Sequence, residues 1–350
     1  MGVVEPESDD QPLWRRLFVP ALMLAFLVFV FGWFLPRLID YRAVIDTLLD
    51  LAAGEFLILV ALGTVRLMAE AWIYVALIPG LPLGKSLQAF LASTTVATFM
   101  PYPADLVVRF GMYRVWGIDA TAAGVGIMTA SFWTIGVKLV LPVLGLIVLV
   151  VNGVASDEVV TLTFLAIGVL VAVFLVIVAA VRSEGFVHWL GRAAAGLWAW
   201  LTGLFNRPVG EDFTAVTEEK FSEFREQTVD VVRSGWVRAT VATVASQAIW
   251  FVILVVSLRF VGVPADAVSL EAAFVAFCLA QLASFFPTPG GVGATEAVYV
   301  MVLTIPTDGG FADEIAAAAF LVRIFTWLLP IVYGAPALLR FNRKQKVTAT

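Results

Sequence analysis

Histidine and cysteine are nearly absent from this chain, which has 350 residues but only one of each, His188 and Cys278. A zinc site or a histidine-based catalytic triad therefore has little to be built from. An internal disulfide is impossible with a single thiol. Charged residues make up only 14% of the sequence and the net charge is -5, so no basic patch tracks a nucleic-acid backbone. We expect no metal, no cofactor and no nucleic-acid partner.

Hydrophobic residues make up 61% of the chain, which is more than a soluble domain of this size carries. Apolar runs long enough to cross the hydrocarbon layer recur along the sequence. They include the stretches 18–35, 56–78, 122–151, 162–181 and 241–261. These runs are too many for a single anchor. The sequence therefore predicts an all-α integral membrane protein that forms one polytopic domain over residues 1–350, without a soluble catalytic domain.

The distribution of Lys and Arg predicts the topology, because loops rich in these residues face the cytoplasm. Basic residues gather around Arg15 and Arg16, in the central segment 182–237 and in the tail 340–350. The connections 152–160, 261–269 and 305–314 contain neither Lys nor Arg. We therefore expect both chain termini, including the leader 1–14, in the cytoplasm and these three connections outside. The central segment predicts amphipathic helices at the membrane surface.

This charge map requires two segments, 86–119 and 270–306, to leave the membrane on the side where they entered. The sequence thus predicts about six full transmembrane helices and two re-entrant helical hairpins. The hairpins resemble each other, since Phe-Met-Pro-Tyr-Pro at 99–103 has a counterpart in Phe-Phe-Pro-Thr-Pro at 285–289. The charge map enters them from opposite sides, which favours an inverted repeat, an architecture of transporters. Chance similarity between apolar helices that end in proline is the alternative.

The segment Pro-Thr-Pro-Gly-Gly-Val-Gly-Ala-Thr-Glu-Ala at 287–297 breaks a helix inside an apolar region. Hydrocarbon tolerates such a break only where it lines a protein-enclosed or wet cavity. A helix that restarts near Ala294 would point backbone N–H groups into that cavity, where a phosphate or carboxylate fits. The candidate site residues here are Pro289, Gly290, Gly291, Gly293 and Glu296. A simple tight turn is the alternative.

Ionisable side chains at membrane depth need partners. Arg66 and Glu70 lie four residues apart, so we expect a structural ion pair on one helix face.

Two pairs of charged residues are candidates for substrate binding. Glu296 and Arg323 lie on neighbouring helices and could meet across the bundle. Arg323 and Lys138 would then hold an anionic headgroup, while Glu296 orders the broken backbone or titrates.

Asp105 and Arg109, one helical turn apart within the first hairpin, are the second candidate pair. A self-satisfied ion pair is the alternative here. Arg109 is expected near the cytoplasmic surface, where it could contact anionic lipid headgroups.

These motifs resemble the family of lysylphosphatidylglycerol synthase transmembrane, or flippase-like, domains. The resemblance rests on PTPGGVGATEA, PYPADLVVR and LVRIFTWLLPIVYG, and it covers nearly the whole chain. Pro289, Gly290, Gly291, Gly293, Glu296 and Arg323 match the family's pattern. The first motif departs from it, because Ala104 alone stands where the family commonly has Gly-Arg, and Lys138 stands where the next helix tends to show Arg and Asp. Headgroup recognition in the first half is therefore expected to differ.

The resemblance implies a lipid flippase or transporter of the cell membrane that is not itself an enzyme. Its substrates would be anionic lipids, such as aminoacylated phospholipids or polyprenyl-phosphate-linked sugars. It would stand alone, with membrane lipids and a separate lipid-modifying enzyme as partners. One alternative is a non-catalytic scaffold that docks such an enzyme through residues 211–233. A membrane transferase is disfavoured, because paired carboxylates and histidines for acid–base catalysis are lacking.

Overall fold

We describe a computed structural model of the chain, in which every regular element of the described residues is helical. The described residues are 41–99, 104–153, 160–161, 163–169, 171–172, 175, 212–285 and 291–348. In chain order the elements are α2 (Tyr41–Leu49), α3 (Ala53–Leu77), α4 (Leu83–Phe99), α5 (Ala104–Val115), α6 (Ala120–Val151), α9 (Asp212–Phe260), α10 (Leu270–Ala283), α11 (Ala294–Thr304), the short 3-10 turn η4 (Ile305–Thr307), α12 (Ala312–Arg323), the π-helical segment η5 (Ile324–Leu328) and α13 (Leu329–Thr348).

Within these residues, four helical stretches are long and apolar enough to cross a bilayer. They are α3, α6, the part of α9 from Gly235 to Phe260, and the run Ala312–Phe341 through α12, η5 and α13. A multi-pass membrane protein, as the sequence predicts, is therefore confirmed. The predicted span at 18–35 and most of the one at 162–181 lie outside the described residues, so a total of six spans stays a prediction.

Both predicted hairpins fold as pairs of short helices. In the first segment α4 packs against α5, and in the second α10 packs against α11. These helices have 17, 12, 14 and 11 residues. At ~1.5 Å per residue, each is shorter than the ~30 Å hydrocarbon layer. Re-entry through one membrane face stays a prediction, because helix length alone does not fix where the membrane lies.

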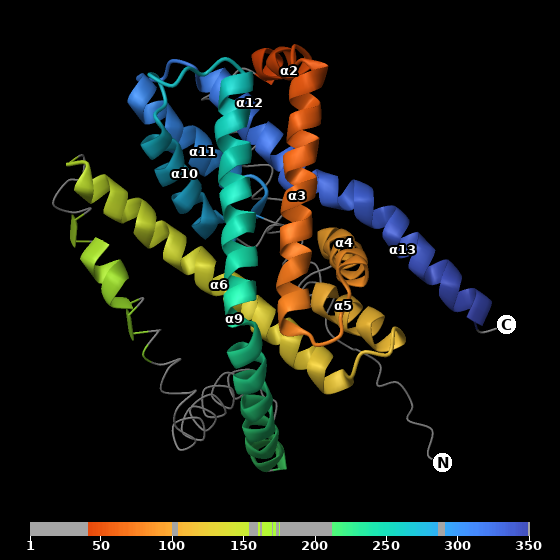
Figure 1. Ribbon diagram of the computed structural model, residues 1–350. Coiled ribbons are helices and arrows are strands. Elements are labelled where there is room, and N and C mark those ends of the chain that lie inside the picture. The colour runs from red at the N-terminus through yellow and green to blue at the C-terminus, as the bar shows by residue number, and fades with distance from the viewer. Residues whose placement is uncertain are drawn as a thin grey trace, which may run out of the picture.

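The helix α3 packs most extensively against α9, and the two run antiparallel (Figure 1). Ala76 near the end of α3 lies beside Gly235 of α9. Farther along, Glu70 contacts Ser246, and Arg66 contacts Trp250. Residue numbers therefore rise along α9 in the direction in which they fall along α3. If both helices cross the membrane, they cross it in opposite directions.

Contacts elsewhere are reciprocal between the two halves. The helix α4 of the first hairpin packs against α13, which follows the second hairpin; α10 of the second hairpin packs against α6, which follows the first. Likewise α3 contacts α6, and α9 contacts α12. An inverted repeat predicts this exchange of partners, because a two-fold axis between α3 and α9 would turn each contact into the other.

Glycines allow the closest of these helix crossings. A Cβ at Gly334 of α13 would lie 2.2 Å from Leu91 O of α4. A Cβ at Gly145 of α6 would lie 2.8 Å from Cys278 Cβ of α10. Small residues that let backbones approach are typical of membrane helix packing. Both crossings of this reciprocal pair, α4 with α13 and α10 with α6, therefore depend on a glycine at the point of contact.

Two details refine the sequence predictions. The α9 helix is continuous from Asp212 into the membrane span, so the predicted amphipathic helix at 211–233 and the span are one element; residues 182–211 lie outside the described part. The α6 helix begins at an N-cap, Asp119, whose carboxylate accepts hydrogen bonds from the N–H groups of Thr121 and Ala122. These bonds, chiefly that from Ala122, hold the pKa of the Asp119 carboxyl below its usual value.

Candidate functional site

Glu296 and Arg323 form a buried ion pair, as the sequence predicts. Arg323 Nε lies 2.5 Å from Glu296 Oε1, and Arg323 Nη2 lies 3.1 Å from Glu296 Oε2. The Glu296 side chain is 3% exposed and that of Arg323 is 13% exposed. A paired carboxylate and guanidinium with two hydrogen bonds is the strong form of this interaction. The pair joins the first turn of α11 to the last residue of α12.

The same pair holds the helix break in place. Glu296 Oε2 accepts the Gly293 N–H at 2.8 Å, and Arg323 Nη2 donates to Gly291 O at 3.2 Å. Gly291 and Gly293 have φ values of +70° and +85°, a region that favours glycine. These contacts agree with the prediction that Glu296 orders the broken backbone. Pro289 and Gly290 lie outside the described residues.

The sequence predicts that an anion binds at the start of α11, but the carboxylate of Glu296 already lies at this position. Glu296 sits in the first turn of α11, where the helix dipole favours a negative charge. It also neutralises Arg323, one of the two cations expected to hold a headgroup. A lipid phosphate would have to compete with Glu296 for both groups.

A second polar cluster lies halfway along α3 and halfway along the apolar part of α9, Gly235–Phe260. Arg66 Nη2 lies 3.3 Å from Glu70 Oε1, which confirms the predicted pair on α3. Ser246 Oγ of α9 donates to the same carboxylate oxygen at 2.6 Å. The Arg66 guanidinium carbon lies 4.5 Å from the centroid of the Trp250 ring, a cation–π contact. Arg66 and Glu70 are each only 8% exposed.

Lys138, in the middle of α6, lies near this cluster, because α6 packs against both α3 and α9. Glu70 and Arg66 are the charged groups that influence Lys138, the first by attraction and the second by repulsion. The sequence predicted that Lys138 acts together with Arg323, which belongs to the other cluster. With Lys138 counted, two cations surround one carboxylate here, and that carboxylate, Glu70, already accepts hydrogen bonds from Arg66 and Ser246.

The π-helical segment η5 links the two clusters. Tyr299 of α11 is 1% exposed, and the charges of Arg323, Glu296 and Arg66 act on its buried hydroxyl. On the other side, Arg66 Nη1 donates to Thr326 O of η5 at 3.5 Å. The η5 segment begins directly after Arg323. Single-turn π segments are frequent at functional sites.

Several buried polar atoms in this region have no hydrogen-bond partner among the described residues. They are Arg66 Nε, Trp250 Nε1, the Tyr299 hydroxyl and Gln247 Oε1. Three of these four groups can donate a hydrogen bond. Two of them, Arg66 Nε and Trp250 Nε1, are donors that belong to the cation–π pair of the central cluster.

Asp105 and Arg109 also meet, with Arg109 Nη2 3.9 Å from Asp105 Oδ2. Arg109 is 3% exposed, so it lies inside the bundle and not at a surface where lipid headgroups would reach it. Its Nε and Nη2 donate to Ser93 Oγ at 3.2 and 2.8 Å, and its guanidinium stacks on and hydrogen-bonds to Tyr74. These contacts clamp α5 to α4 and α3.

The residues that α9 contributes to the central cluster were not predicted from the sequence. Ser246, Gln247 and Trp250 interrupt an apolar span at helical spacing, and that pattern could have marked a polar face of α9. Which helix this face meets is not encoded locally. In the part of the chain that the structure describes, no group of His, Cys, Asp and Glu could hold a metal ion.

The chain was compared with known families and curated proteins. The sequence model of the lysylphosphatidylglycerol synthase TM region matches residues 20–334, which is nearly the whole chain. No curated protein matches it significantly. The matched range contains both hairpins, the Glu296–Arg323 pair and the central cluster. The chain therefore belongs to the lysylphosphatidylglycerol synthase TM region family.

Proposed function

We propose that the protein moves or presents a lipid with a phosphate-containing, anionic headgroup, and that Lys138 binds this phosphate in the central cluster. Family membership supports a lipid-related role in a membrane. The observation that carries the proposal is the charge balance around the cluster, where two cations, Arg66 and Lys138, lie within the influence of one carboxylate, that of Glu70, which is paired with Arg66. A surplus cation at membrane depth is costly unless an anion joins it.

The position of the cluster supports the same function. Arg66, Glu70 and Ser246 lie where α3 and α9 cross, at the interface between the two reciprocal halves. In transporters built from inverted repeats, substrates bind at this interface near the middle of the bilayer. The broken helix between α10 and α11 is connected to this cluster through Arg323 and η5, whose Thr326 carbonyl accepts a hydrogen bond from Arg66.

In this proposal the chain catalyses no covalent step, and aminoacylated phospholipids or polyprenyl-phosphate-linked sugars are its substrates. It resides in the cell membrane with both termini in the cytoplasm, crosses the membrane about six times and has two re-entrant hairpins in inverted repeats. A separate enzyme modifies the lipid. The Glu296–Arg323 pair fixes the helix break between α10 and α11, and Lys138 provides the charge that recognises the substrate.

The test compares the wild type with Lys138→Met, which keeps the length of the side chain and removes its charge. The matched control is Lys85→Met, because Lys85 is also partly buried but lies in the first turn of α4, against Trp116. Native mass spectrometry identifies the lipids that co-purify with each protein. Proteoliposomes with a fluorescent anionic lipid, quenched from outside by dithionite, measure transbilayer movement.

We expect Lys138→Met to lose the retained anionic lipid and the movement, while Lys85→Met keeps both. The Arg66–Glu70 pair stays balanced in Lys138→Met, so the variant should fold. Equal retention and equal movement in all three proteins would refute the proposal and favour the scaffold alternative.

A further inference from the structure

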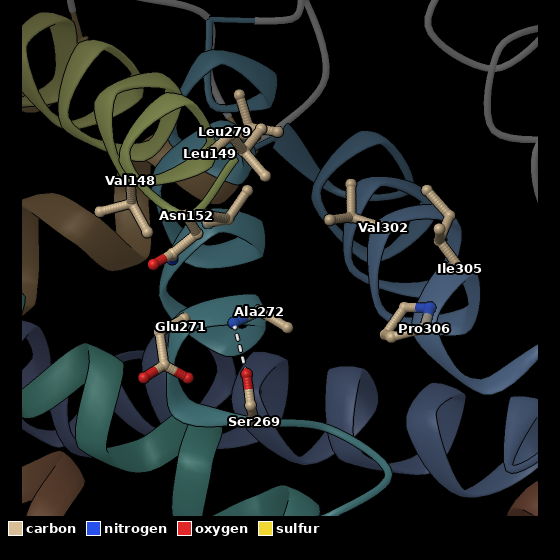
Figure 2. Close-up of a pocket in the computed structure, with 11 residues that line it drawn as sticks. Val148, Leu149, Asn152, Ser269, Glu271, Ala272, Leu279, Val302, Ile305 and Pro306 are labelled. Atoms are coloured by element: carbon tan, nitrogen blue, oxygen red, sulfur yellow. Dashed lines mark hydrogen bonds between the residues drawn. The ribbon is translucent and has the colours of Figure 1, made fainter. Parts of the chain in front are cut away.

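A pocket of about 580 Å³ lies where three helix ends meet, away from both charged clusters. It is bounded by the end of α6, the start of α10 and the end of α11 (Figure 2). The charge map places the loops next to all three ends outside the cell. The structure therefore brings together three ends that the sequence predicts on one side of the membrane.

The lining of the pocket is amphipathic. Val148, Leu149, Val275, Leu279 and Val302 supply apolar walls. Figure 2 shows Leu149 and Leu279 at one end and the side chains of Glu271 and Ser269 at the other. The Ser269 hydroxyl is used as the N-cap of α10, where it accepts the Ala272 N–H at 3.2 Å. Glu271 is exposed, which leaves its carboxylate as the charged group at the pocket mouth.

The surroundings of the mouth are acidic. None of the described residues that line the pocket is Lys or Arg. Asp266 and Asp308, both exposed, lie in the adjoining loops. Arg259, the cation at the end of α9, donates to Val263 O and Val268 O at 2.8 and 2.7 Å, so it is engaged by its own loop. An anionic group at this mouth would meet like charge, and an uncharged or cationic donor would meet an acceptor.

We propose that this pocket binds one hydrocarbon chain of a membrane amphiphile whose polar end is not anionic and donates a hydrogen bond to Glu271. The apolar walls, the single carboxylate at the mouth and the outward position that the charge map predicts together define this ligand. The site differs in charge and place from the central cluster, and it does not depend on the transport proposed above. It would hold a lipid of the outer leaflet.

The test uses the full chain in nanodiscs of a zwitterionic lipid. Three photoactivatable C12 probes differ only in their polar end, which is an ammonium, an alcohol or a carboxylate. Cross-linked peptides are identified by mass spectrometry. Leu279→Trp and Val302→Trp fill the pocket from different helices. Leu282→Trp is the control, because Leu282 is on α10 but 50% exposed and does not line the pocket.

In the wild type we expect the ammonium and alcohol probes to label α10 and α11 about tenfold more than the carboxylate probe, the factor that ~1.4 kcal/mol supplies. Either filling variant should abolish this labelling, and Leu282→Trp should not. Glu271→Gln, at an exposed position that does not endanger folding, should raise labelling by the carboxylate probe towards that of the others. Equal labelling by all three probes in the wild type, or labelling that survives both filling variants, would overturn the proposal.

Discussion

Replacing Glu296 by Gln tests most directly whether the Glu296–Arg323 pair holds the helix break in place. The change keeps size and shape but removes the charge that neutralises Arg323. Glu296 currently accepts two bonds from Arg323 and one from the Gly293 N–H. The amide oxygen of Gln can keep the bond to Gly293, whereas its NH2 group faces a guanidinium that only donates.

The expected cost follows from leaving a buried cation unpaired. Breaking a buried ion pair by removing one partner costs roughly 3–5 kcal/mol, and the retained backbone bond puts Glu296→Gln at about 3 kcal/mol. The double variant Glu296→Gln/Arg323→Met removes the unpaired charge as well. It loses the donor to Gly291 O, a bond worth about 1 kcal/mol, so most of the stability should return.

The free energy of unfolding, measured by steric trapping in bicelles, decides between the outcomes. We expect the double variant to regain about 2 kcal/mol relative to Glu296→Gln, which is the difference between losses of about 3 and about 1 kcal/mol. A loss below about 1 kcal/mol in Glu296→Gln, or a double variant as unstable as the sum of the single ones, would refute the reasoning. The pair would then contribute little to holding the break.

Three further predictions use the same stability measurement. Gly291→Ala should cost more than Gly80→Ala, because both positions have positive φ but only at Gly291 would a Cβ meet backbone, 2.8 Å from Ala283 O; equal losses would contradict this. Glu70→Gln should lose about 2 kcal/mol more stability than Arg66→Met, because Glu70→Gln leaves two buried cations without a carboxylate, whereas Arg66→Met leaves one cation and one carboxylate. The reverse order would show that Lys138 is not a partner of Glu70. Arg109→Lys should lose about 2 kcal/mol, because an ammonium cannot replace the planar guanidinium that bonds and stacks at once; an unchanged stability would show that α5 is held by other contacts.

Pairs within one helix or across a short connection could be predicted from the sequence. The Arg66–Glu70 pair follows from helical spacing, and the Glu296–Arg323 pair follows from two neighbouring segments that must bury their charges. The four described spans follow from hydropathy. In each case the physical cause is local, because charged side chains in hydrocarbon must pair and backbone polar groups must hydrogen-bond within a helix.

Contacts between distant helices could not be predicted in this way. Arg109 was expected near a surface, but Tyr74 of α3 and Ser93 of α4 draw it into the bundle. Lys138 was expected to act with Arg323, but α6 packs on α3 and α9, so that Glu70 and Arg66 are the charged groups that influence it. The helix α2, which packs against α12, was not predicted at all. Such partners depend on how helices far apart in sequence pack.

The two clusters are arranged so that a movement at one must reach the other. Arg323 holds the helix break and directly precedes η5, and the Thr326 carbonyl of η5 accepts from Arg66. A Cβ at Gly63 of α3 would lie 3.0 Å from Phe325 O, so α3 and η5 are in close contact with no space to slide independently. Because packed elements shift as units, a displacement of the second hairpin would move Arg66 relative to Glu70. In the proposed transport, that displacement would change the surroundings of Lys138, so that the substrate is bound in one state and released in another.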